Sequence, residues 1–118
     1  MRGIRGAITV ENNSREEILT ATQEMMEKII LANNLQQEEV AAVFFTATRD
    51  LDAAYPAQAV RKMGWTLTPL MCYQEMHVDG SLEKCIRVIV LTQTELEQNQ
   101  IKHCYLRGAQ VLRPDLIR

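Results

Sequence analysis

An arginine stands in the middle of the most apolar stretch of this sequence. Residues 85–91 have the sequence Cys-Ile-Arg-Val-Ile-Val-Leu, and such a short run rich in β-branched residues predicts a strand. Because side chains alternate along a strand, Arg87 shares a face with Ile89 and Leu91. A guanidinium among apolar neighbours is costly unless an anion meets it. The anion is either Glu75, at the end of the preceding predicted strand, or a bound ligand.

Further arginines occur in predicted strand and loop contexts, at Arg5, Arg61 and Arg113, and Tyr105 lies on the last predicted strand. An arginine side chain offers paired donors that match the two oxygens of a carboxylate. The sequence contains no phosphate-binding glycine loop, no dinucleotide fingerprint and no G-x-S-x-G motif. These residues therefore indicate a site for a small polycarboxylate. Each of the other arginines is equally typical of a solvated surface, so the hypothesis depends mainly on Arg87.

The cysteines and histidines show no catalytic or metal-binding pattern. Cys72 and His77 are close in sequence, but a small, partly buried contact is a simpler role for Cys72 than that of a nucleophile. His77 and His103 lack the spacing of metal ligands. The three cysteines include no C-x-x-C pair, and the chain starts without a signal-peptide pattern. We therefore expect reduced thiols and a cytoplasmic protein.

Composition limits the classes of partner. The 118 residues are 47% hydrophobic and 24% charged, as in ordinary globular proteins. A formal net charge of −2 argues against nucleic acid as a main partner. No apolar run approaches the ~20 residues of a membrane span. We expect one domain over residues 1–118, large enough to fold without a metal or a disulfide.

The pattern of apolar and turn residues predicts five strands and two helices. Strands are expected at residues 1–10, 40–47, 68–75, 85–91 and 103–106, and helices at residues 15–33 and 55–64. Ser14 is the expected N-cap of the first helix in a capping box with Glu17. In the second, Pro56 suits the first helical position and Gly64 the position after the C-cap. Residues 113–118 form a tail that we expect to be mobile.

The order of elements is β-α-β-α-β-β-β. We expect an α/β (α+β) domain with a mixed five-stranded sheet and both helices on one face. Two helices cannot cover both faces of a five-stranded sheet, so the second face needs another chain.

Six blocks in the same order resemble the monofunctional chorismate mutases of the trimeric α/β type. They are residues 2–7, residues 55–57 with 59–61, Cys72 with residues 74–76, residues 85–88, residues 105–106 and residues 111–116. The resemblance implies rearrangement of chorismate to prephenate, on the route to phenylalanine and tyrosine, without cofactor or metal. It also implies a homotrimer with a barrel-like core and three sites at subunit interfaces, which agrees with the uncovered sheet face.

The resemblance assigns roles by position. Arg87 matches the cation at the ether oxygen of the breaking bond, and Arg5 and Tyr105 match residues that hold the substrate carboxylates. Glu75 matches the acid that accepts a hydrogen bond from the ring hydroxyl, and Cys72 matches the thiol beside that hydroxyl. Because Glu75 then has a task of its own, this assignment disfavours a structural salt bridge between Arg87 and Glu75.

Further positions match residues that line or close the family's site. They are Tyr55, Ala57, Arg61, Leu112 and Arg113. Two departures stand out: Gln58 occupies a position where relatives can carry lysine, and Tyr55 replaces a phenylalanine. Both changes affect the expected affinity for substrate, whereas the residues expected to carry the chemistry are unchanged.

Cys72 and Glu75 are three residues apart, so a regular strand points them to opposite faces. Either the strand is bulged, or the two residues serve neighbouring sites across a subunit interface, which we favour. Two other functions remain open at this point. One is an imine or enamine hydrolase on a similar trimeric fold, and the other is a non-catalytic trimer that binds a small carboxylate metabolite.

Overall fold

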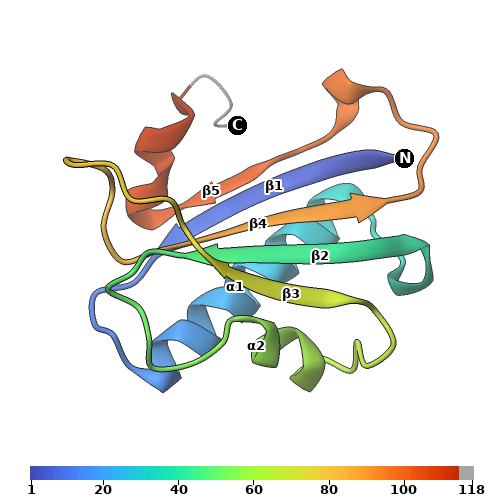
Figure 1. Ribbon diagram of the computed structural model, residues 1–118. Coiled ribbons are helices and arrows are strands. Elements are labelled where there is room, and N and C mark those ends of the chain that lie inside the picture. The colour runs from blue at the N-terminus through green and yellow to red at the C-terminus, as the bar shows by residue number, and fades with distance from the viewer. Residues whose placement is uncertain (115–118) are drawn as a thin grey trace.

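The computed structural model describes residues 1–114, which form a five-stranded sheet with two helices on one face (Figure 1). The strands are β1 (Arg2–Thr9), β2 (Val40–Ala47), β3 (Leu70–Gln74), β4 (Cys85–Thr92) and β5 (Cys104–Leu106). The helices are α1 (Arg15–Asn33) and α2 (Ala57–Lys62), with short 3-10 helices η1 (Gln37–Glu39), η2 (Gln98–Gln100) and η3 (Arg107–Leu112). The predicted order of strands and α-helices is confirmed.

The sheet is mixed, as predicted. Its strand order is β3-β2-β4-β1-β5. Strand β4 pairs antiparallel with both β1 and β2, whereas the outer strands β3 and β5 run parallel to β2 and β1. Since a two-residue hairpin cannot join parallel strands, β2 reaches β3 through α2. The carboxyl ends of β2 and β3 therefore lie at the same edge of the sheet.

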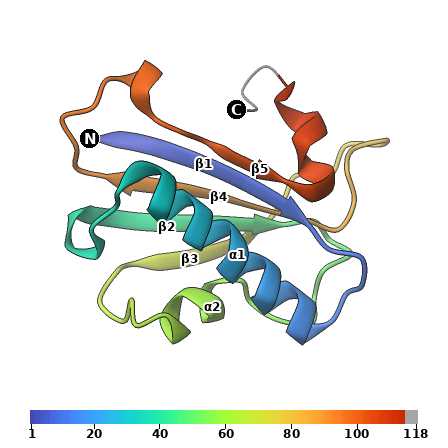
Figure 2. The same ribbon diagram turned by 180° about the vertical axis from the view of Figure 1, so that it is seen from behind.

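Helix α1 covers the central strands, and Figure 2 shows it lying across them with α2 beside it. Its apolar stripe includes Ile18, Met25 and Ile29, which are fully buried or nearly so. The sheet meets this stripe with the alternate side chains of β1 and β4, such as Ile8 and Val90. Each large apolar side chain contributes about 1.5–3 kcal/mol when fully buried. The core therefore lies between the sheet and the helices.

The N-terminus of α1 is capped in a slightly different way from the prediction. Ser14 is the N-cap, and its hydroxyl accepts a hydrogen bond from the backbone N–H of Glu17. The Glu17 carboxylate, however, reaches past Ser14 and accepts from the backbone and side-chain N–H groups of Asn12. These hydrogen bonds, chiefly that of the Asn12 side chain, lower the pKa of Glu17. The reciprocal half of the predicted capping box is thus wrong, because the turn brings Asn12 closer.

Other boundaries shift by one or two residues. Pro56 is the N-cap of α2 rather than its first residue, and Gly64 has a φ of 97° just after the C-cap, as predicted for a residue that tolerates left-handed backbone. Strand β3 ends at Gln74, so Glu75 lies just beyond it. Of the predicted mobile tail, only Arg113 and Pro114 lie within the described residues. No helix within residues 1–114 is long and apolar enough to cross a membrane.

The second face of the sheet carries partly exposed apolar side chains. Met71 is 51% exposed, Tyr73 48% and Ile89 37%. Phe44 lies on the same face and its ring centroid is 6.3 Å from that of Tyr73. Neither α1 nor α2 covers this face (Figure 1), and the 3-10 helix η3 packs only against its corner near Ala7 and Tyr105. The prediction that the two helices leave one face uncovered is confirmed for a single chain.

Candidate active site

A row of four side chains crosses the uncovered face of the sheet. Arg87 on β4 is paired with Thr46 on β2 and with Ala7 on β1, and Ala7 is paired in turn with Tyr105 on β5. Directly paired residues point to the same face of a sheet. Two residues before Ala7, the Arg5 guanidinium carbon lies 5.9 Å from the centroid of the Tyr105 ring, which is within cation–π range. The strand register therefore gathers Arg5, Arg87 and Tyr105 on one face.

Glu75 joins this row from the end of β3. Its carboxylate Oε1 lies 3.4 Å from Arg87 Nε, and both side chains are 25% exposed. The same oxygen accepts a 2.5 Å hydrogen bond from Thr46 Oγ1, and the backbone N–H of Glu75 donates to the Ala47 carbonyl. The expectation that Arg87 and Glu75 do not pair is wrong, because β2 lies between β3 and β4 and the two side chains meet across Thr46 of β2.

The ion pair leaves donors of the row without hydrogen bonds. Arg87 Nε is close enough to Glu75 for attraction, but its N–H does not point at the carboxylate in hydrogen-bond geometry. Arg87 Nε and Tyr105 Oη are buried atoms with no hydrogen-bond partner among residues 1–114. Leaving a buried polar group unpaired costs about 1–3 kcal/mol. Two such groups on one face indicate that their acceptors lie outside residues 1–114.

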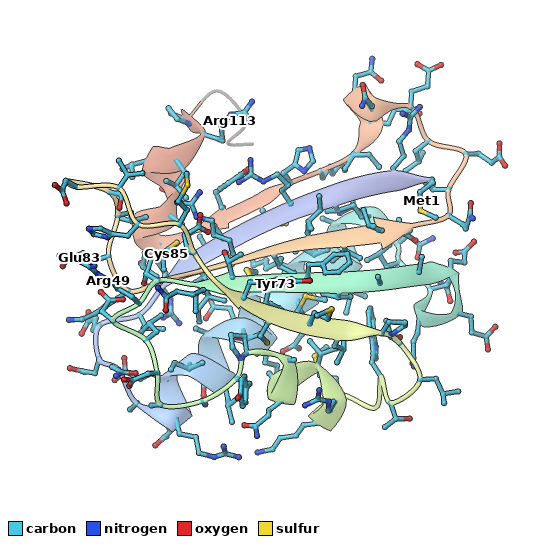
Figure 3. The ribbon with its side chains drawn as sticks, viewed as in Figure 1. Met1, Arg49, Tyr73, Glu83, Cys85 and Arg113 are labelled. Atoms are coloured by element: carbon cyan, nitrogen blue, oxygen red, sulfur yellow. The ribbon has the colours of Figure 1, made fainter. Side chains whose placement is uncertain are left out.

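Tyr105 belongs to a small apolar cluster beside this row. Ala7, Cys85, Tyr105 and Ala109 are buried together, and Leu112 of η3 packs against them. Burial raises the pKa of the Cys85 thiol, while the adjacent Arg87 guanidinium acts in the opposite direction. Because the first effect is the larger, Cys85 is a neutral neighbour of Arg87. Arg113 follows η3 on the same side of the molecule (Figure 3).

The remaining candidate residues lie at the β3 edge of the sheet, on its helix-covered side. Cys72 on β3 is paired with Phe45, which is fully buried in the helix-side core. Burial raises the pKa of its thiol, opposed by the backbone of Ala57 and the charge of Arg61. Tyr55, 67% exposed, lines a hollow of about 560 Å³ together with Cys72. Tyr55, Ala57, Arg61 and Cys72 are therefore neighbours.

The candidate residues thus divide into two groups within one chain. The open-face group comprises Arg5, Glu75, Arg87, Tyr105 and Leu112. The edge group comprises Tyr55, Ala57, Arg61 and Cys72. The prediction that Cys72 and Glu75 point to opposite faces is confirmed, and β3 needs no bulge because Glu75 lies beyond its end. Neither group alone surrounds a ligand.

Two residues beside Arg87 were not among the site residues predicted from the sequence. Thr46 holds Glu75 from the opposite strand, and Cys85 lies beside the guanidinium. The strand pairing that places Thr46 has no local signal, whereas Cys85 shares the alternating face of Arg87 and was open to prediction.

Together the open-face group and the edge group supply fixed cations, one carboxylate and a neutral thiol, which suits a small anionic ligand carrying a hydroxyl. Among residues 1–114, no three His, Cys, Asp or Glu side chains cluster as metal ligands would.

Comparisons with known proteins agree with this arrangement. Residues 1–116 match the family model described as chorismate mutase type I. The chain is 51% identical to chorismate mutase AroH of Bacillus subtilis (strain 168) over 117 residues, covering 98% of this chain and 92% of that protein. It is 50% identical to chorismate mutase AroH of Thermus thermophilus, covering 98% and 96%.

A solved structure of a chorismate mutase also matches the fold of this chain. The chorismate mutase from Clostridium thermocellum superposes with a TM-score of 0.93 at 48% identity, covering 94% of this chain and 99% of that one. The family resemblance and the fold class are confirmed. The chain therefore belongs to the chorismate mutase type I family and is an enzyme that isomerises chorismate to prephenate.

Proposed function

We propose that Arg87 accelerates this reaction by stabilising the negative charge that grows on the ether oxygen of chorismate. The rearrangement is pericyclic and unimolecular, so it needs neither a proton donor nor a nucleophile. A protein can help it by holding the compact conformer of the substrate and by placing fixed charge where charge develops. The observation that carries the proposal is the buried Arg87 Nε, which has no hydrogen-bond acceptor within residues 1–114.

The rest of the open-face group binds and orients the substrate. Arg5 and Tyr105, whose guanidinium carbon and ring centroid are 5.9 Å apart, hold carboxylates of chorismate. The unpaired Tyr105 hydroxyl supports this role, because a carboxylate supplies the acceptor that it lacks. Glu75 accepts a hydrogen bond from the ring hydroxyl, and the hydrogen bond from Thr46 to its Oε1 holds its carboxylate in position for this role. Leu112 and Arg113 close the site from η3.

The edge group completes the site of a neighbouring chain. Cys72, kept neutral by burial, lies beside the ring hydroxyl, while Tyr55, Ala57 and Arg61 line the wall. When two different surfaces of a protein bind each other, successive copies of the chain form a closed ring if the rotation between neighbouring copies brings the last copy back to the first. We therefore propose a homotrimer in which each of three interfaces holds one site. Met71, Tyr73 and Ile89 are the exposed apolar residues of the open face. Their exposure in the single chain supports the proposal, because a trimer interface would bury them.

We assign the whole chain, residues 1–118, to one catalytic domain that works in the cytoplasm on the route to phenylalanine and tyrosine. Cys72, Cys85 and Cys104 are all free thiols, which is usual in a reducing compartment. The substrate contacts proposed above use protein side chains alone. Cell fractionation with a tagged chain tests the compartment.

Mixed trimers test whether the site is shared. Chains carrying Cys72→Asp are defective in the edge group, and chains carrying Arg87→Ala are defective in the open-face group. When the two inactive chains are unfolded together and refolded in equal amounts, about a quarter of the interfaces combine the two intact groups. We expect activity to recover toward about a quarter of the wild-type level, followed as loss of the ultraviolet absorbance of chorismate.

A matched control uses two lesions in the same group. Mixing Glu75→Gln chains with Arg87→Ala chains produces no interface with an intact open-face group, so no recovery is expected. Mass spectrometry of intact assemblies verifies that mixed trimers form. Equal recovery in both mixtures, or none in verified Cys72→Asp and Arg87→Ala trimers, contradicts a site divided between these two groups.

A further inference from the structure

The stability of helix α1 does not explain why an arginine stands at position 15. It is the first residue of α1, and a helix N-terminus carries partial positive charge that favours acidic side chains and disfavours cations. The next two residues, Glu16 and Glu17, follow that rule. No carboxylate of residues 1–114 lies within 4.0 Å of the Arg15 guanidinium to offset its charge. The side chain therefore has some other use.

A contact across the two helices fixes where Arg15 points. Its Nη1 donates a 2.7 Å hydrogen bond to Oε1 of Gln58 on α2, 43 residues along the chain. A guanidinium has five N–H donors, so this single bond orients the group without using up its capacity. Because Gln58 is a neutral amide, the positive charge of Arg15 remains uncompensated.

Arg15 and Gln58 both line the hollow of about 560 Å³ that contains Tyr55 and Cys72. The charged side chains on its wall are Arg15, Arg49 and Asp52. Asp52 already accepts a 2.7 Å hydrogen bond from the Asn13 amide, whereas Arg49 contacts His77, with Nη2 at 3.2 Å from Nε2. The wall therefore carries two cations against one anion, and Arg15 lies on the same wall as Tyr55 and Cys72 of the edge group.

We propose that Arg15, oriented by Gln58, is a substrate-binding residue that attracts a carboxylate of chorismate to the edge-group side of the site. This inference rests on the proposed assignment of Tyr55 and Cys72 to that site. An exposed cation at the mouth of a hollow raises the local concentration of an anionic ligand, and salt screens its effect. Arg15 therefore affects the affinity for substrate, while the rearrangement itself depends on Arg87.

The variant Arg15→Ala tests the inference against Lys28→Ala, which removes the same charge from the same helix about 20 Å away along its axis. Lys28 lines a different hollow, on the outer side of α1. For Arg15→Ala we expect KM to rise about threefold to fivefold at low ionic strength, as removal of one exposed charge contact implies. The rise should shrink at about 0.5 M salt, and kcat should stay within about twofold. Lys28→Ala should leave both constants unchanged.

A second arm moves the cation rather than removing it. In the double variant Arg15→Ala with Gln58→Lys, an ammonium replaces the amide on the same wall, and we expect KM to return toward the wild-type value. Alanine is a good helix former, so Arg15→Ala should unfold at the same denaturant concentration as the wild type. Equal KM values in Arg15→Ala and Lys28→Ala, or no recovery in the double variant, overturn the inference.

A third variant, Arg61→Ala, distinguishes failure of the role proposed for Arg15 from failure of the proposal that the edge group belongs to the substrate site. Arg61 belongs to the edge group but does not line the hollow that Arg15 lines. If Arg61→Ala raises KM and Arg15→Ala does not, the role of Arg15 is refuted and the proposed site stands. If neither variant changes KM, both the edge-group assignment and the role of Arg15 are refuted.

Discussion

Replacing Arg87 with alanine should remove most of the catalytic rate and little of the stability. Its neighbours Ile86 and Val88 face the buried core, whereas Arg87 faces the opposite side of the sheet. The pair with Glu75 is partly exposed, at 25% for each side chain, so its loss costs at most about 1 kcal/mol of folding free energy. Glu75 also keeps its hydrogen bond from Thr46.

The expected loss of rate is much larger than the loss of stability. Removing one preorganised donor from the charge that develops in a transition state costs about 10²–10³ in kcat, equivalent to about 2.7–4 kcal/mol. Arg87→Lys should remain strongly impaired, because an ammonium restores the charge but not the planar donor geometry. Steady-state kinetics on chorismate gives kcat, and urea unfolding with native mass analysis gives stability and assembly.

A double-mutant cycle separates the role of Arg87 toward substrate from its pairing with Glu75. If Arg87 serves only to hold Glu75, the double variant Arg87→Ala with Glu75→Gln should be no slower than Glu75→Gln alone. We expect it to be slower by about the factor seen for Arg87→Ala in the wild-type background. Turnover by Arg87→Ala within about tenfold of the wild type, with the same assembly state as the wild type, refutes the electrostatic role.

Three further predictions concern residues around the site and the fold. Thr46→Val should lower kcat/KM by about tenfold and Thr46→Ser should restore it, because a hydrogen bond to a charged group contributes about 1.5–3 kcal/mol; kinetics of the two variants tests this. Arg113→Ala should raise KM more than it lowers kcat, since Arg113 lies at the edge of the site, and a change confined to kcat contradicts this. For Glu17, whose pKa is lowered from 4.5 by the hydrogen bonds of Asn12, the stabilising effect is present above that value and is lost as the pH falls through the lowered pKa. Urea unfolding of Glu17→Gln should therefore show a weaker loss of stability in acid than the wild type.

Local patterns predicted most of the fold. The two-residue period placed Arg87 opposite the buried faces of Ile86 and Val88, and the apolar run at residues 40–47 matched β2 residue for residue. The same period predicted that Cys72 and Glu75 diverge. These features depend on neighbours within a few residues, so the sequence carries them directly.

The missed features depend on contacts between distant segments. Thr46 meets Arg87 only because β2 and β4 pair in one particular register, and 41 residues separate them in the sequence. The Glu17 carboxylate prefers Asn12 to Ser14 because of the shape of the turn before α1. Neither the spacing nor the type of these residues specifies such geometry, since strand register is set by the packing of the whole sheet.

The pairing of Arg87 with Glu75 is compatible with the catalytic role that we propose for Arg87. A guanidinium on a partly buried face needs a countercharge, and Glu75 supplies one at 3.4 Å without occupying the Nε–H in a hydrogen bond. Thr46 holds the carboxylate, so the position of Glu75 does not depend on Arg87 alone. Glu75 thereby balances the charge that the partly buried Arg87 retains, while the Arg87 Nε–H stays available for the ether oxygen. Because little has to rearrange when charge develops on that oxygen, this arrangement meets the requirement for electrostatic preorganisation that the proposed role of Arg87 sets.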